Sequence, residues 1–86
     1  MIVNIPSPLR SYTQNAGQVA GTGASVQEVL ADLDARYPGL KFRIIDEQDG
    51  IRKHIKIFVN CEQVHNLSAF VGSDDAVHII CALSGG

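Results

Sequence analysis

The clearest periodic pattern along the chain is helical and covers residues 25–40. Apolar residues recur there at intervals of three and four, which places them on one stripe of an α-helix: Val26, Val29, Leu30, Leu33 and Tyr37. Ser25 with Glu28 forms a capping box, in which the serine side chain accepts from first-turn amides. Pro38-Gly39 ends the pattern. We therefore expect one amphipathic helix, which must cover another layer such as a sheet.

The remaining patterns are those of strands. Residues 1–5 are short, β-branched and alternating, and the prolines that follow close this first strand. Clear strands are expected across 54–60, with Ile55, Ile57 and Val59 on one face, and across 76–83, with a short edge strand within 61–67. Two weaker candidates lie near Gln18–Ala20 and at Phe42–Ile45.

This order of elements predicts an α+β fold. About four or five strands and one main helix follow the order ββ-α-ββ(β), which is typical of a roll with one helix over a mixed sheet. A helix that joins the second strand to the third places the first and last strands side by side in the middle. We expect residues 1–83 to form this domain and residues 84–86 to form a flexible tail.

Composition agrees with one small globular domain. The chain has 86 residues, of which 45% are hydrophobic and 19% charged, far from the composition of disordered chains. The net charge is −2, and the seven Lys and Arg residues are scattered, with only Arg52 and Lys53 adjacent. This pattern argues against a nucleic-acid or membrane partner.

The chain shows no apolar run long enough to span a membrane and no secretory pattern at its start. Cys61 and Cys81 are too few for a disulfide framework, so we expect reduced thiols and a cytoplasmic protein.

Two chemical alternatives involve these cysteines. Cys61 with His65, and His78 with Cys81, are near the spacing of zinc ligands. Strand alternation points His78 and Cys81 to opposite faces, so no metal site is expected. Cys61 and His65 could also form a nucleophile pair, but the sequence shows no orienting third group or oxyanion donor for it.

Three motifs carry a family resemblance. The segment "IFVNCEQV" (57–64) resembles the VN-x-E-x-V turn of prokaryotic sulfur carriers, and "GSDDAVHIICALSGG" (72–86) resembles their glycine-terminated ending. The segment "NIPSPLRSYT" (4–13) is similar to the start of the carrier used in thiocarboxylate-dependent cysteine synthesis. The resemblance to these ubiquitin-like β-grasp proteins spans nearly the full chain. Cys61 and Cys81 depart from the family pattern, which often has a turn former and a proline there.

The resemblance implies that the reactive group is the C-terminal carboxylate of Gly86. A carboxylate is an anion at neutral pH and has no leaving group, so it must be activated before sulfur can attack it. The family implies an E1-like enzyme that uses ATP to form an acyl-adenylate, which sulfide equivalents convert to a thiocarboxylate. The chain would be a protein co-substrate rather than an enzyme, with no bound cofactor. Gly85 and Gly86 lack a Cβ and could thread a narrow passage.

Ordering such a tail costs about 1–2 kcal/mol per residue in backbone entropy, so the body must supply a docking surface. Alternation on the last strand turns Val77 and Ile79 toward the helix and leaves two neighbours outward. The resulting patch is similar to the recognition patch of ubiquitin. The candidate partner-binding residues are Phe58, His78, Ile80, Leu83 and Ser84. Arg10 and Glu62 also match family motifs, and a plain surface role is open for both.

Three outcomes for the activated chain are considered. In the cysteine pathway, the thiocarboxylate adds to an aminoacrylate on a PLP-dependent cysteine synthase, and a zinc metalloprotease releases the product. Siderophore-type thiocarboxylates, methionine, molybdopterin and thiamine are other sulfur destinations within the same class. The alternatives are a ubiquitin-like modifier joined to protein lysines through Gly86, and the small subunit of a molybdopterin-synthase-type complex.

Overall fold

The computed structural model describes residues 1–82. Four residues of the expected site, Leu83, Ser84, Gly85 and Gly86, lie outside this range. The elements are β1 (Ile2–Asn4), the 3₁₀ helix η1 (Ser7–Thr13), β2 (Gln18–Ala20), α1 (Val26–Arg36), α2 (Leu40–Ile44), β3 (Ile55–Val59), β4 (Glu62–Val64) and β5 (Ala76–Cys81).

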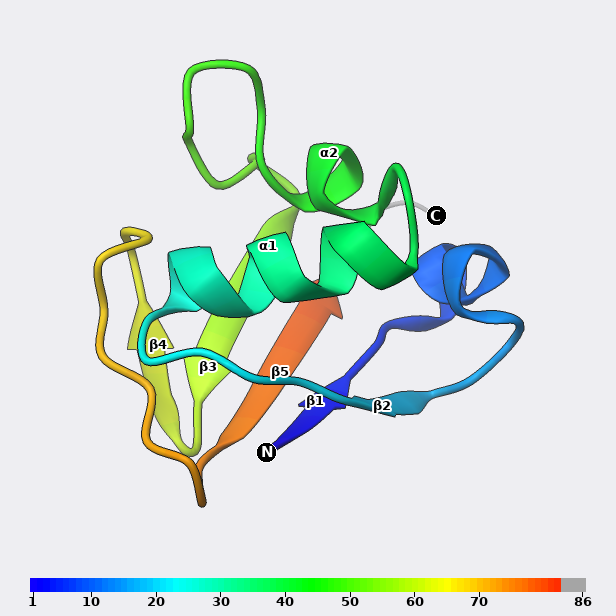
Figure 1. Cartoon of the computed structure of the whole chain (residues 1–86). Coiled ribbons are helices and arrows are strands. Elements are labelled where there is room, and N and C mark those ends of the chain that lie inside the picture. Colours follow the sequence, from blue (N-terminus) through cyan, green and yellow to red (C-terminus); the bar gives the residue numbers. More distant parts are fainter. Residues whose placement is uncertain (83–86) are drawn as a thin grey trace.

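The strands form one mixed sheet in the order β2-β1-β5-β3-β4. β1 and β5 are parallel, and the other neighbouring strands are antiparallel. The first and last strands therefore lie side by side in the middle, as the sequence predicts (Figure 1). The expected hairpin of β1 and β2 and the expected edge strand β4 are also confirmed.

The core lies between this sheet and α1, which crosses one face of it (Figure 1). The predicted stripe is confirmed, because all but one of its side chains are buried: Val26, Val29, Leu30 and Leu33. Tyr37 ends the helix and packs at the edge of the core. Among the sheet residues, Val3, Ile57 and Val77 are the most buried.

The N-terminus of α1 carries the predicted cap with one difference. Ser25 Oγ accepts from the Glu28 backbone N–H at 3.2 Å, as expected. The Glu28 carboxylate accepts from the N–H of Ala24 at 2.9 Å, one residue before the serine. Both ends of the motif thus satisfy a backbone donor, and the loop that precedes α1 is held against its first turn.

The predicted strand at Phe42–Ile45 is wrong, because these residues belong to α2 and to its C-terminal cap. Leu40 and Ile44 are four residues apart and both are buried, whereas Phe42 between them is 56% exposed. In so short a run, alternation and helical spacing fit equally well, and packing decides. Gly39, with φ of 94°, starts the helix immediately after α1, and Asp34 Oδ1 accepts from the Lys41 N–H at 3.2 Å.

Candidate functional site

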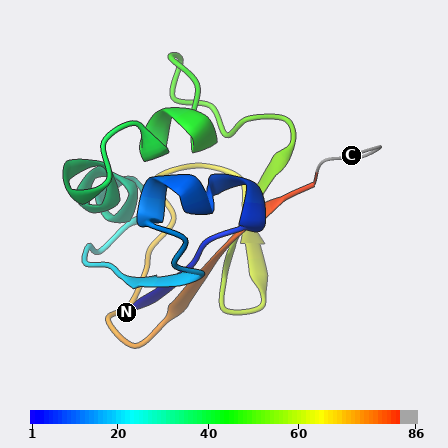
Figure 2. The ribbon, with the colours of Figure 1, turned by 90° about the vertical axis from the view of Figure 1, so that its right-hand side faces the viewer.

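The face of the sheet opposite α1 presents the outward side chains of the strands, and no helix of residues 1–82 covers it (Figures 1 and 2). The strand register aligns five of these side chains in one row across the sheet: Gln18, Asn4, His78, Phe58 and Gln63. The predicted adjacency of Phe58 and His78 is confirmed, since they are direct cross-strand partners. Both side chains are half-buried by their neighbours in the row.

Two hydrogen bonds order the polar half of this row. Gln18 Nε2 donates to Asn4 Oδ1 at 3.0 Å, which turns the Asn4 amide nitrogen toward His78. Asn4 Nδ2 then donates to His78 Nδ1 at 3.0 Å, so a neutral ring carries its proton on Nε2. The hydrogen bond from Asn4 therefore fixes one ring nitrogen of His78 on the side of β1, away from Phe58. Sequence reasoning did not select Asn4, although alternation within residues 1–5 places it outward with Ile2.

Ile80 lies two residues further along β5, directly opposite Lys56 of β3. It is 44% exposed, whereas Val77 and Ile79 of the same strand are buried against the helix layer. The predicted alternation of β5 is thus confirmed. We call the outward residues Phe58, His78 and Ile80 the docking face. Ile80 and Phe58 are diagonal neighbours on this face, and adjoining outward apolar side chains of this kind mark partner sites.

A hollow of about 400 Å³ borders Ile80 on the side of β1. Its other wall is the start of η1, including Pro6, Pro8 and Arg10. Arg10 Nε donates to the Ile5 carbonyl at 3.0 Å, and the guanidinium packs over Gly17. The arginine of the family-like "IPSPLR" motif therefore fixes η1 to the end of β1 and forms part of the wall beside the docking face.

β5 delivers the chain to this same end of the sheet. Cys81 pairs with Ile55, and the Ala82 N–H donates to the His54 carbonyl at 2.7 Å. The described part of the chain thus ends two residues after Ile80, next to the segment that enters β3. Whatever follows Ala82 begins at the border of the docking face.

The opposite end of β5 is held by the turn between β3 and β4. Asn60 has φ of 56°, and its side chain bonds to the first residue of β5 and to the residue before it: Oδ1 accepts from the Ala76 N–H at 3.0 Å, and Nδ2 donates to Asp75 Oδ1 at 2.9 Å. The Asn60 amide, followed by the Gly72 N–H, lowers the pKa of Asp75 below its ordinary value. Asn60, the asparagine of the family-like "VN-x-E" turn, therefore holds this turn against the start of β5, and we call this pair of hydrogen bonds the latch.

This latch explains how the turn accommodates Cys61, where the family resemblance leads us to expect a turn former. The left-handed conformation of the turn falls on Asn60, and Cys61 is not among the non-glycine residues with positive φ. Cys61 and Glu62, which lies at the start of β4, are both exposed to solvent. Both cysteines are free thiols.

We expect Asn60→Ala to lower the free energy of unfolding by about 2–4 kcal/mol, because the change removes two side-chain hydrogen bonds and forces alanine into a positive φ. Asn60→Gly is the matched control: it loses the same bonds but adopts that φ without strain, so its loss should be about 1 kcal/mol smaller. Urea unfolding of the three proteins measures both values. Equal stability of Asn60→Ala and wild type would contradict the latch.

The four residues of the zinc alternative do not form a metal site. His78 and Cys81 face opposite sides of β5, and within residues 1–82 no three His, Cys, Asp or Glu side chains are grouped to hold a metal ion. Across the same residues, no helix combines the length and apolar character needed to cross a bilayer.

This sheet order, one main helix on one face and an open second face at the root of the chain's last residues define the ubiquitin-like β-grasp class. The chain belongs to the ThiS family, whose model matches residues 3–86. It is 33% identical over 89 residues to the sulfur carrier protein CysO of Mycobacterium tuberculosis (strain ATCC 25618 / H37Rv), covering 98% of this chain and 96% of CysO.

Solved structures agree with this assignment. A chain in the crystal structure of the Amycolatopsis orientalis BexX/CysO complex has a TM-score of 0.92 and 34% identity, covering 99% of this chain and 98% of that chain. The small archaeal modifier protein 1 of Methanosarcina acetivorans, with a TM-score of 0.81 at 24% identity over 99% of this chain and 94% of its own, shows the fold alone. The predicted family and fold are thus confirmed, and the relative that shares a third of its sequence with this chain is a sulfur carrier.

Proposed function

We propose that this chain is a sulfur carrier whose Gly86 carboxylate is converted to a thiocarboxylate. The supporting observation is the path of β5, which brings the chain to the border of the docking face immediately before the family-matched residues 83–86. A partner that grips the docking face would hold the point from which the last four residues start, and these can reach at most about 13 Å from Ala82. The name of the relative CysO supports the same role.

The chemistry requires two displacements. A carboxylate oxygen of Gly86 attacks the α-phosphorus of ATP on an E1-like enzyme, and pyrophosphate leaves. A sulfide equivalent then attacks the carbonyl carbon, and AMP leaves with that oxygen. The carrier provides the acyl group, whereas the enzyme provides catalysis. In this step Gly85 and Gly86 offer a carbonyl without flanking side chains.

For the destination of the sulfur we propose cysteine synthesis. The supporting observations are the "IPSPLR" segment and the overall similarity to CysO. The expected acceptor is an aminoacrylate on a PLP-dependent cysteine synthase, and a zinc metalloprotease would release the product. The existence of the BexX/CysO complex shows that a relative of this fold and sequence assembles with a partner protein. For this chain, co-purification with its partners identifies the synthase.

Intact mass spectrometry tests the proposal. The purified chain is incubated with ATP, a sulfide source and each E1-like adenylating enzyme of its own organism. Exchange of oxygen for sulfur should add about 16 Da, and omission of ATP should prevent the gain. The mass of the chain isolated from cells checks that it ends at Gly86. Absence of the gain with every such enzyme would refute the proposal.

The modifier alternative shares the activation step and differs in the acceptor. The similarity in fold to a small archaeal modifier protein keeps this alternative in view. Blots of cell lysate against a tag at the N-terminus distinguish the two: a modifier gives a ladder of heavier conjugates, whereas a carrier runs as one band.

A further inference from the structure

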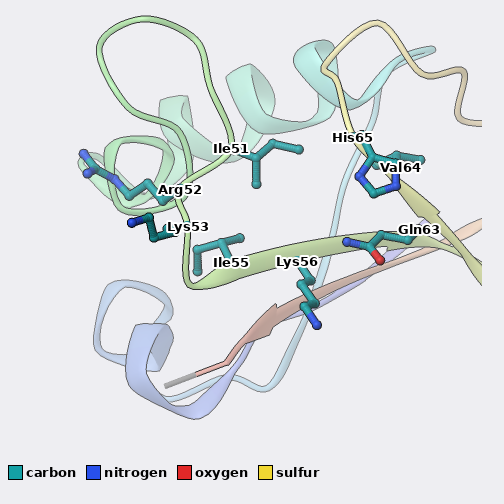
Figure 3. Close-up of a pocket in the computed structure, with 8 residues that line it drawn as sticks. All are labelled: Ile51, Arg52, Lys53, Ile55, Lys56, Gln63, Val64 and His65. Carbon is teal, nitrogen blue, oxygen red and sulfur yellow. The ribbon is translucent and has the colours of Figure 1, made fainter. Parts of the chain in front are cut away.

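Charge is distributed unevenly around Ile80. A second hollow, of about 250 Å³, lies on the β3 side of the sheet and includes Arg52, Lys53 and Lys56 in its lining (Figure 3). With Arg10 in the hollow on the β1 side, the two hollows hold four of the seven Lys and Arg residues. Neither hollow is lined by any of the nine Asp and Glu residues, all of which lie within the described part of the chain.

Most of this positive charge is not neutralised locally. Within residues 1–82 the only salt bridge joins Arg36 to Asp32, so the exposed Lys53 and Lys56 have no carboxylate partner there. Arg10 donates to a neutral carbonyl. Arg52 differs, because it donates to the Phe42 carbonyl at 2.7 Å and its guanidinium lies over the Phe42 ring at 4.6 Å.

The two ends of β5 have opposite charge. Glu62, Asp74 and Asp75 gather where the strand starts. The smallest separation along the strands is that of Glu62 from Lys56, three residues or about 10 Å at roughly 3.3 Å per residue, because Glu62 pairs with Val59. This exceeds the Debye length of about 8 Å at physiological ionic strength, so the positive end acts on a partner as a separate patch. The acidic residues Asp46, Glu47 and Asp49 lie on the loop that rises beyond the helix layer (Figure 1).

We propose that Arg10, Lys53 and Lys56, here called the basic rim, dock the carrier onto an acidic surface of its activating enzyme. The inference rests on the proposed function. The exposed Ile80 lies between Lys56 and the hollow that holds Arg10, so the matching surface is an apolar pocket flanked by Asp and Glu side chains. An aliphatic centre within three spaced cations fits a protein groove rather than a nucleic-acid backbone. The rim accelerates encounter and orients the carrier so that its last residues face the active site.

The test compares two double variants with the same change in net charge. Lys53→Glu with Lys56→Glu reverses the exposed part of the rim, whereas Lys41→Glu with Arg43→Glu changes α2, in the helix layer away from the docking face (Figure 2). Thiocarboxylate formation is followed against carrier concentration, with the enzyme that modifies the wild-type chain, at about 50 and 500 mM NaCl.

The rim variant should raise KM about tenfold or more at low salt, with kcat unchanged, and the increase should fall to about threefold or less at high salt. The α2 variant should stay within about twofold of wild type. Thermal unfolding checks both variants, and Lys53→Gln with Lys56→Gln replaces the rim variant if it does not fold. An unchanged KM, an equal effect of the α2 variant, or an increase that salt does not reduce overturns the basic rim. Failure of the wild-type chain to gain mass overturns the proposed function instead.

Discussion

Gly85→Val should lower kcat/KM for thiocarboxylate formation at least about a hundredfold, equivalent to roughly 2.7 kcal/mol of transition-state stabilisation. A β-branched side chain next to the reacting carbonyl would contact the walls of the enclosed passage that we expect in the activating enzyme. It would also restrict the φ and ψ values that only glycine adopts freely. Because the position follows the folded body, the thermal midpoint should remain that of wild type. Mass spectrometry of the reaction and a thermal melt measure the two effects.

Two further variants distinguish an effect on entry of the last residues into the enzyme's passage from an effect on docking of the folded body. Deleting Gly86 should abolish the mass gain, because the new end is displaced by one residue from the adenylating site. Ile80→Asp should act differently: placing a charge in an apolar pocket should raise KM about thirtyfold or more with little change in kcat. If Gly85→Val reacts as fast as wild type, the tail does not enter a narrow passage.

Much of the fold could be predicted because the decisive patterns are local and long enough. α1 has five apolar positions on one stripe and a recognisable cap, so both its existence and its buried face are correct. The alternation of β3 and β5 likewise predicted which side chains face the helix layer and which form the docking face. The faces place Phe58 and His78 on the same side of the sheet, whereas their direct pairing depends on the register, since a slip by two residues would keep the same faces.

The failures occur where the pattern is short or depends on distant residues. The strand predicted at Phe42–Ile45 was wrong, because alternation over four residues cannot be told from helical spacing, and α2 is set by its packing against α1. The 3₁₀ helix η1 was not predicted. It ends in two successive left-handed residues, Gln14 and Asn15, which carry no pattern of their own.

In the candidate site, too, residues that follow from a local pattern were predicted and those that depend on distant residues were missed. Ile80 was found because alternation along one strand suffices to turn it outward. The bond between Asn4 and His78 was missed because it joins residues 74 apart through the parallel pairing of β1 and β5. The basic rim also depends on register: Lys56 and Arg10 are distant in sequence and lie on either side of Ile80 only in the folded sheet. The roles of residues 83–86 stay predictions of the sequence.

The largest expected effect on stability concerns Gly23, in the crossover from β2 to α1. Its φ is 147°, and a Cβ added there would lie 2.8 Å from the Val29 backbone nitrogen and 2.9 Å from the Glu28 carbonyl carbon. Backbone atoms of a helix cannot move aside as the end of a side chain can. The crossover is also fastened on both sides of Gly23, since Asp32 Oδ2 accepts from the Thr22 N–H at 3.1 Å and Glu28 accepts from the Ala24 N–H.

Gly23→Ala should therefore lower the free energy of unfolding by about 2–5 kcal/mol, from backbone strain together with the overpacked contact. For a domain of this size, the thermal midpoint should fall by roughly 10 °C or more. Gly50→Ala is the matched control: its Cβ would meet only the Asp46 carboxylate, at 3.2 Å, where a shift of a few tenths of an ångström suffices, so the loss should stay within about 1 kcal/mol. Since α1 lies on the face opposite Ile80, the Gly23 variant should still form thiocarboxylate well below its midpoint. Equal melting of both variants would mean that the crossover is not held against α1.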